Sequence, residues 1–152
     1  MPRPFSFPKA AMRQPADVLF AGEKPFPILP AVDHYAGAEK LMRKAMSLQA
    51  ELAESNGHPI FDITCDCEDG ARAGAEQEHA EMCAELIMDA GNRHGRIAAR
   101  IHDVTHAHWQ ADLDILVRRA GTRLPFITFP KPRGAADVAT QIGELRRIEK
   151  DA

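Results

Sequence analysis

The stretch "FDITCDCEDGA", residues 61–71, combines two patterns that seldom share one strand. Isoleucine and two cysteines alternate with polar residues, which is typical of a β-strand with one apolar face. The polar positions end in Asp66, Glu68 and Asp69, although buried strands avoid carboxylates. We therefore expect a strand whose second face lines a wet functional site, followed by a sharp turn at Gly70.

The charge balance of the whole chain limits its partners. The 152 residues include 19 basic and 22 acidic side chains, a net charge of −3. Such a chain has no excess of basic residues for binding nucleic acid or an anionic membrane surface. No apolar run reaches the length of a membrane span, and prolines and charges interrupt residues 1–20 where a signal peptide would lie. We expect a cytoplasmic protein without nucleic-acid or membrane partners.

The cysteines do not form a known motif in the sequence. The chain has three, Cys65, Cys67 and Cys83, and an odd number without a secretion signal argues against a disulfide framework. The first two form C-x-C, and no second pair accompanies them. Buried thiols that behave as small apolar groups are the expected state.

Strand-like and helix-like segments alternate after a proline-rich start. Residues 1–27 predict an extended arm, and residues 28–152 predict four strand–helix units. The expected strands are 27–32, 59–66, 95–103 and 124–132, and the expected helices are 36–55, 74–92, 108–121 and 135–150. Strands about thirty residues apart suit parallel pairing through crossover helices. The predicted class is α/β, and the chain has room for half of a (β/α)8 barrel of about 250 residues.

Apolar spacing predicts which helix faces are buried. The expected stripes are Leu41, Ala45, Leu48 and Leu52 in the first helix, and Met82, Leu86 and Ala90 in the second. Asn56-Gly57 is expected to end the first helix. No Gly-rich nucleotide-binding loop is present.

Polar residues collect where the expected strands end. In the third strand, Arg100 and His102 share one face, while the second strand places Asp66 and Glu68 on one face. The residues gathered at this edge are Asp33, His34, Asp66, Glu68, Asp69, Arg100, His102, Asp103 and Lys131. Ligands bind at this edge in parallel α/β folds, and polar groups on only one strand face favour a barrel over an open sheet.

Four motifs together resemble one family. "DITCDCEDGA" is similar to the "LDLEDA/G" stretch of the citrate lyase β-subunit-like family, also called HpcH/HpaI aldolases. "AARIHDVTHAHWQADLDILV" resembles its "VRIN…W…DL..L" segment, and "FITFPKP" resembles its "I.LPK" strand. "ILPAVDHYAGAEKLMRKAM" loosely matches "LFVPG…KA". The motifs occur in the family's order and cover residues 28–140.

The resemblance implies a (β/α)8 barrel and a Mg²⁺-dependent carbon–carbon lyase or aldolase. It implies a small carboxylic acid or acyl-CoA substrate, as in citryl-CoA and malyl-CoA lyases. Arg100 stands where the family's arginine binds the keto-acid carboxylate, a role that suits a bidentate guanidinium. Glu68 and Asp69 match the acids of the metal–water or substrate network, Asp66 matches the preceding aspartate, and Lys131 matches the rim lysine.

Departures from the family pattern qualify these roles. His102 replaces the "VRIN" asparagine, and it is a candidate for substrate hydrogen bonding or proton transfer. The family's direct Mg²⁺ carboxylates lie on the next two strands, beyond Ala152, so Glu68 and Asp69 are expected in an outer shell. We therefore expect either a piece of a longer protein or a half-barrel that needs a partner. By resemblance, the assembly is a homo-oligomer, a trimer or a hexamer.

Other functions remain open at this point. The same scaffold could hydrolyse an acyl-CoA thioester, and a non-catalytic subunit or interaction module is a further alternative. A Schiff-base aldolase acting through Lys131 and a zinc site at His102, His106 and His108 are weaker alternatives.

Overall fold

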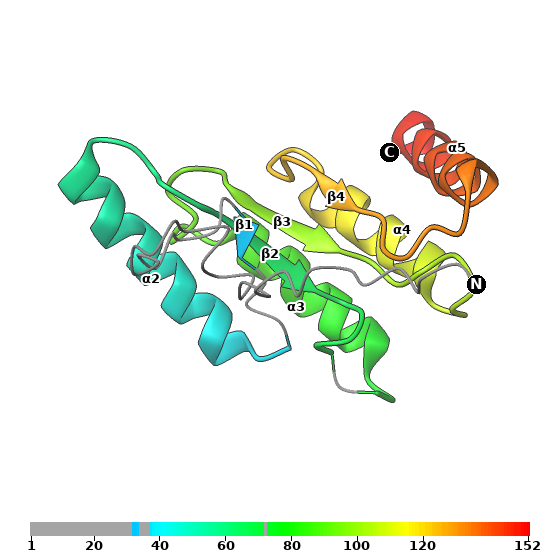
Figure 1. Cartoon of the computed structure of the whole chain (residues 1–152), viewed down its shortest axis with the longest axis horizontal. Helices are drawn as coiled ribbons and strands as arrows, with labels where there is room; N and C mark the ends of the chain where they lie inside the picture. Colours follow the sequence, from blue (N-terminus) through cyan, green and yellow to red (C-terminus); the bar gives the residue numbers. More distant parts are fainter. Residues whose placement is uncertain (1–31, 34–36, 72) are drawn as a thin grey trace, which may run out of the picture.

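The computed structural model describes residues 32–33, 37–71 and 73–152. One sheet of four parallel strands has the order β1-β2-β3-β4 (Figure 1). The strands are β1 (Val32–Asp33), β2 (Asp62–Asp66), β3 (Ile97–Arg100) and β4 (Ile127–Thr128). The helices are α2 (Glu39–Asn56), α3 (Glu76–Met88), α4 (Trp109–Ala120) and α5 (Ala135–Asp151). The predicted α/β class is confirmed, and sequential parallel strands with a helix after each are the arrangement of the first half of a (β/α)8 barrel.

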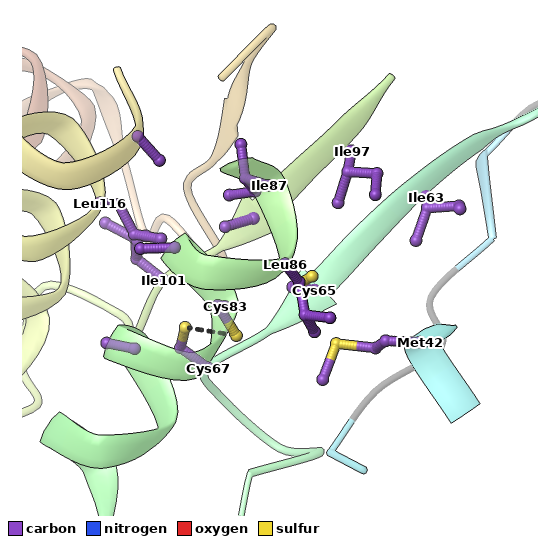
Figure 2. Close-up of a cluster of buried hydrophobic side chains, with 14 of the residues drawn as sticks. Met42, Ile63, Cys65, Cys67, Cys83, Leu86, Ile87, Ile97, Ile101 and Leu116 are labelled. Carbon is purple, nitrogen blue, oxygen red and sulfur yellow. Dashed lines mark hydrogen bonds between the residues drawn. The ribbon is translucent and has the colours of Figure 1, made fainter. Parts of the chain in front are cut away.

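The core lies between one face of the sheet and the helices. β2 and the residue after it direct Ile63, Cys65 and Cys67 into this core, and β3 contributes the alternate residues Ile97 and Ala99 (Figure 2). Helices α3 and α4 pack against each other over this face, and α4 also packs against α5. The alternation predicted for these two strands is confirmed. Burying each large aliphatic side chain contributes about 1.5–3 kcal/mol, so this face provides much of the folding free energy.

The predicted buried stripe of α2 is confirmed at Ala45, with Leu48 and Leu52 partly buried against the core, but the centre of the buried face lies about one position away and Leu41 is wrong. The helix buries Met42, Ala45, Met46 and Gln49, whereas Leu41 is 51% exposed. The reason is the polar residue on the core face: Gln49 Nε2 donates to the Phe61 carbonyl oxygen at 2.7 Å, which ties α2 to the start of β2. A hydrogen-bonded glutamine at a buried position cannot be distinguished from a surface residue by hydropathy alone.

The predicted stripe of α3 also differs from the observed one. Leu86 is buried as expected, but Met82 is only partly buried and Ala90 lies beyond the helix and is exposed. The buried face of α3 is centred on Cys83 and includes His79. Like Gln49 in α2, this buried polar residue interrupts the apolar spacing from which the buried face was predicted. Both errors have the same physical origin, which is a polar side chain with a partner in the core.

Helix and strand ends follow local chemistry. α2 ends at Asn56, and Gly57 has φ 77°, the left-handed conformation that the predicted Asn-Gly stop requires. The strands are shorter than predicted, and most of the first expected strand and the arm at 1–27 lie outside the described residues. Within the part of the chain that the structure describes, no helix is long and apolar enough to cross a membrane.

An apolar groove of about 520 Å³ runs between β4 and α5. Its lining includes Leu124, Phe126, Phe129 and Leu145, and Phe126 is exposed. In a closed (β/α)8 barrel the next strand–helix unit packs at this place. The groove is therefore consistent with residues 37–71 and 73–152 forming part of the first half of a barrel.

Candidate active site

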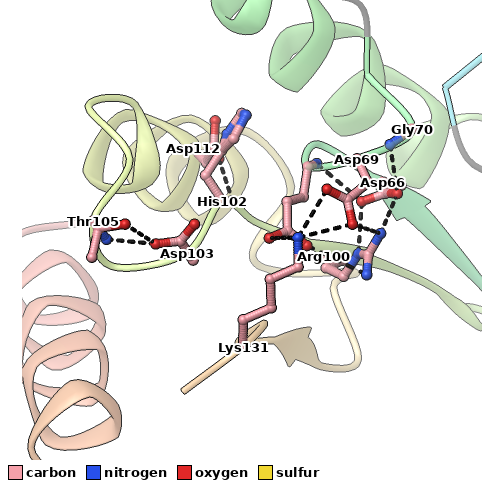
Figure 3. Close-up of polar contacts among 10 residues, drawn as sticks. Asp66, Asp69, Gly70, Arg100, His102, Asp103, Thr105, Asp112 and Lys131 are labelled. Carbon is pink, nitrogen blue, oxygen red and sulfur yellow. Dashed lines mark hydrogen bonds and ion pairs between the residues drawn. The ribbon is translucent and has the colours of Figure 1, made fainter. Parts of the chain in front are cut away.

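The sheet register brings Asp66 and Arg100 together. The two residues are direct partners at the C-terminal ends of β2 and β3, so their side chains lie side by side on the face opposite the core. Arg100 Nε donates to Asp66 Oδ1 at 2.8 Å, and an Nη atom donates to Oδ2 at 2.6 Å (Figure 3). This is a side-on bidentate pair, the strongest form of arginine–carboxylate contact.

Both carboxylate oxygens of Asp66 accept hydrogen bonds from neighbouring groups. Its side chain is 1% exposed, and it also accepts hydrogen bonds from the backbone N–H groups of Glu68 and Gly70, both at 3.0 Å. Burial alone raises the pKa of this carboxyl, but the bonds from Arg100 and the backbone outweigh it and hold the pKa of Asp66 below its usual value. Asp66 therefore acts as a fixed anion that shapes the turn after β2 and orients Arg100.

Glu68 is a buried carboxylate without a hydrogen bond. Its side chain is 6% exposed, and among the described residues neither of its oxygens has a hydrogen-bond donor in suitable geometry. Two cations flank it at ion-pair distance: an Arg100 Nη atom at 3.4 Å and Lys131 Nζ at 3.1 Å. A carboxylate held in this way keeps lone pairs for a further ligand.

Lys131, which follows β4, contacts the same group of carboxylates. Its Nζ donates to both oxygens of Asp69 at 2.9 Å, and these bonds, followed by the ion-pair contact with Glu68, raise the pKa of Lys131. The residue lies between two prolines and has φ 45°, a left-handed conformation that is costly for a residue other than glycine. Such strain at the sheet edge is typical of functional sites. Here it accompanies a lysine held over the acidic loop, the segment 67–71 after β2 that contains Glu68 and Asp69.

A second pair lies beside this network. His102 Nδ1 is 2.6 Å from Asp112 Oδ2, and the same oxygen accepts the His102 backbone N–H at 2.9 Å. Asp112 is buried, on the first turns of α4. Because the carboxylate accepts from Nδ1, the neutral ring carries its lone pair on Nε2. The His106 ring stacks on His102 with 3.9 Å between centroids.

These groups surround one cavity of about 220 Å³. Its lining residues are Glu68, Asp69, Ala71, Ala73, Glu76, His102, Asp103, His106 and Lys131. Of the residues predicted for the site, Asp66 and Arg100 are not part of this lining, but Arg100 lies at ion-pair distance from two lining residues, Glu68 and Asp69. Asp103 lines the cavity but accepts hydrogen bonds from Thr105, and the side chains of Asp33 and His34 lie outside the described residues. The carboxyl ends of β2, β3 and β4 thus bring these groups together at one edge of the sheet, as the alternation predicts.

Two residues of the site, Asp112 and Glu76, are absent from the sequence-based prediction, and a third, His106, enters it only through the weaker zinc alternative. Asp112 could have been found, because it falls at a helical spacing on the buried face of α4 with Trp109 and Leu116. Glu76, at the start of α3, and His106 reach the cavity because of the path of the loops beside them, for which the sequence contains no comparable periodic pattern.

A solved structure with the same fold identifies the family. A citrate lyase from Burkholderia xenovorans LB400 matches with a TM-score of 0.72 and 44% sequence identity, over 82% of this chain. The chain belongs to the citrate lyase-like family. It spans 37% of the length of that citrate lyase. Scans of protein-family models and of curated proteins give no match. The resemblance inferred from the four motifs is thereby confirmed, whereas the roles of single residues stay predictions.

Proposed function

We propose that this citrate lyase-like chain supplies the carboxylate-binding and proton-transfer part of a Mg²⁺-dependent carbon–carbon lyase. The substrate class is a 3-hydroxy acid or its CoA thioester, cleaved to a keto-acid and a shorter acyl group. The main support for the proposal is the position of Arg100. Asp66 fixes one edge of its guanidinium, and the other edge faces the acidic loop.

The second edge of Arg100 suits a substrate carboxylate. Asp66 binds Nε and one Nη atom of the guanidinium, which leaves the other Nη atom at the end of the side chain. This second Nη atom makes only a longer ion-pair contact of 3.4 Å to Glu68, and the Nη atom that binds Asp66 also lies 3.9 Å from Asp69. A guanidinium can bind two carboxylates, one on each edge, and holding one edge rigid lowers the entropy cost of binding at the other.

The charge of the site favours a divalent cation. Asp66, Glu68 and Asp69 face two cations, Arg100 and Lys131, and Glu76 and Asp103 add further negative charge at the cavity wall. An anionic substrate would be repelled unless a cation accompanied it. The buried oxygens of Glu68, which lack hydrogen bonds, fit the hydrated shell of Mg²⁺, a metal that keeps several of its waters. When bound, Mg²⁺ would polarise the oxygen that becomes the keto group.

His102 is the candidate for proton transfer. Asp112 holds its ring by Nδ1, so Nε2 is the nitrogen that accepts a proton. In cleavage, His102 would take the proton of the substrate hydroxyl as the carbon–carbon bond breaks. It would then return that proton to the carbon of the departing enolate. Atoms and charge balance without a further reactant, and Arg100 would retain the keto-acid carboxylate throughout.

Hydrolysis of an acyl-CoA thioester is the second candidate, because the His102–Asp112 pair could equally activate a water molecule. Product analysis by mass spectrometry separates the two functions. The protein that carries this chain would be incubated with Mg²⁺ and a panel of 3-hydroxyacyl-CoA thioesters that carry a carboxylate on C3, the carbon that becomes the keto group. A keto-acid plus a shorter acyl-CoA in equal amounts supports the lyase, whereas free CoA plus the intact hydroxy acid shows the hydrolase and contradicts the proposal.

A further inference from the structure

Three side chains with metal-ligating atoms converge on the core side of the acidic loop. Cys67 follows β2, and His79 and Cys83 lie one turn apart on α3. One ring nitrogen of the histidine and the two sulfur atoms all lie within 4.8 Å of one another, and all three residues are buried. The structure describes no other group of three histidine, cysteine or acidic side chains that converges in this way.

The two cysteines are free thiols at a spacing that suits a shared ligand. Their sulfur atoms are 3.9 Å apart (Figure 2), far beyond a disulfide bond of about 2.05 Å. Two thiolates bound tetrahedrally to one zinc ion at about 2.3 Å would lie about 3.8 Å apart. The geometry of the pair therefore needs little adjustment to hold zinc.

His79 provides a second, independent observation. It is a polar ring in an otherwise apolar core, and its Nε2 is 2.8 Å from the carbonyl oxygen of Asp66. A carbonyl only accepts, so Nε2 carries the hydrogen and Nδ1 carries the lone pair. Histidines that bind metals in proteins almost always donate the other N–H to a carbonyl or carboxylate, which fixes the ring.

We propose that Cys67, His79 and Cys83 bind one Zn²⁺ ion. Two thiolates and an imidazole are ligands that zinc prefers. Binding would release the two thiol protons to solvent, and the two thiolate charges would then cancel the charge of the ion. The resulting centre is neutral, which suits a core that excludes water.

The position of the ion implies a structural role. His79 reaches the carbonyl of Asp66, and Cys67 directly precedes Glu68, so the ion would tie α3 to the segment that carries the acidic loop. This proposal does not rest on the proposed lyase activity. A zinc centre of this kind would stabilise the fold whatever reaction occurs at the cavity.

Zinc content and X-ray absorption test the proposal on the unmodified protein. The protein that carries this chain would be loaded with Zn²⁺ and freed of excess metal by gel filtration. We expect one retained zinc per chain, with at least two sulfur neighbours at about 2.3 Å. Failure to retain zinc, or a coordination shell of nitrogen and oxygen alone, would overturn the proposal.

Matched variants locate the ion. Cys83→Ser should lose one sulfur neighbour or the zinc itself, while the double variant His106→Gln/His108→Gln should keep the zinc and all of its sulfur neighbours. The second variant removes two of the loop histidines that offer a rival zinc site. Loss of zinc in that variant together with retention in Cys83→Ser would place the ion on the loop and refute the proposed ligands. The absorption result on the unmodified protein decides the matter even if Cys83→Ser does not fold.

Discussion

The two faces of β2 and the residues directly after it bury different kinds of side chain. On one face, Ile63, Cys65 and Cys67 are fully buried against the helices and make apolar contacts. On the other, Asp66 and Glu68 are also almost inaccessible, yet they are anions held by cations from β3 and from the segment after β4. The comparison teaches that burial alone does not distinguish core from site. What distinguishes the two faces is the kind of partner: apolar side chains contact other apolar side chains in the core, whereas the carboxylates of the site pair with cations.

The largest effect is expected from removing the anion that fixes Arg100. Asp66→Ala leaves two backbone N–H groups and a half-buried guanidinium without their acceptor, which should lower the free energy of unfolding by about 3 kcal/mol. Asp62→Ala is the matched control on the same strand face. Its carboxylate contacts the more exposed Arg96, so the loss should be about 0.5 kcal/mol. Urea unfolding measures the free energy of unfolding of both variants. Equal losses would show that Asp66 stabilises the fold no more than an exposed ion pair does.

The same carboxylate predicts a pH dependence. Because the pKa of Asp66 is lowered from 3.8 in the folded state, its stabilisation is complete above about pH 5 and disappears as the pH falls through the folded pKa. The stability difference between the unmodified protein and Asp66→Asn should therefore be constant from about pH 7 to 5 and shrink below about pH 4. A difference that grows on acidification would have the wrong sign for this account.

Arg100→Lys should separate charge from geometry. Lysine keeps the positive charge but cannot bind Asp66 side-on and a substrate carboxylate end-on at once. We expect kcat/KM to fall by about 100-fold, with a melting temperature much less affected than in Asp66→Ala. Arg96→Lys, at the opposite end of the same strands, is the control and should keep full activity. Unchanged activity in Arg100→Lys would remove the arginine from the proposed site.

Asp112→Asn tests whether the second pair positions His102. Asparagine can still accept from the backbone N–H, but it cannot stabilise a charged imidazole. We expect kcat to fall about tenfold while KM changes little, because binding relies on Arg100. Asp114→Asn on the same helix removes an exposed pair with Arg118 and should change neither constant. A rise in KM at constant kcat would indicate that Asp112 supports the structure of the site and does not position His102 for proton transfer.

The smallest effect should come from the apolar face. Ile63→Val removes one methyl group from the core and should cost about 1 kcal/mol of stability without changing kcat. Thermal unfolding and steady-state kinetics on one preparation test this. A change in kcat comparable with that of Arg100→Lys would mean that the two faces are not independent.

The sequence contains enough to predict the scaffold and most of the site. The period-two alternation in β2 and β3 places Asp66 and Arg100 on one face, and the parallel register then makes them neighbours. The buried helix faces were predicted less well, because Gln49 and His79 are polar residues whose partners are backbone carbonyls distant in sequence. The meeting of Cys67 with Cys83 and His79 likewise depends on how α3 packs on the sheet, which no local pattern encodes.

The most direct test of the proposed site is calorimetric binding of a small 2-keto-acid with and without Mg²⁺. The unmodified protein should bind the acid only when Mg²⁺ is present, because the cavity alone is too negative for an anion. Arg100→Lys should bind it at least tenfold more weakly under the same conditions. Binding that is independent of Mg²⁺, or equal in the two proteins, would contradict the assignment of Arg100 and the acidic loop to a carboxylate site.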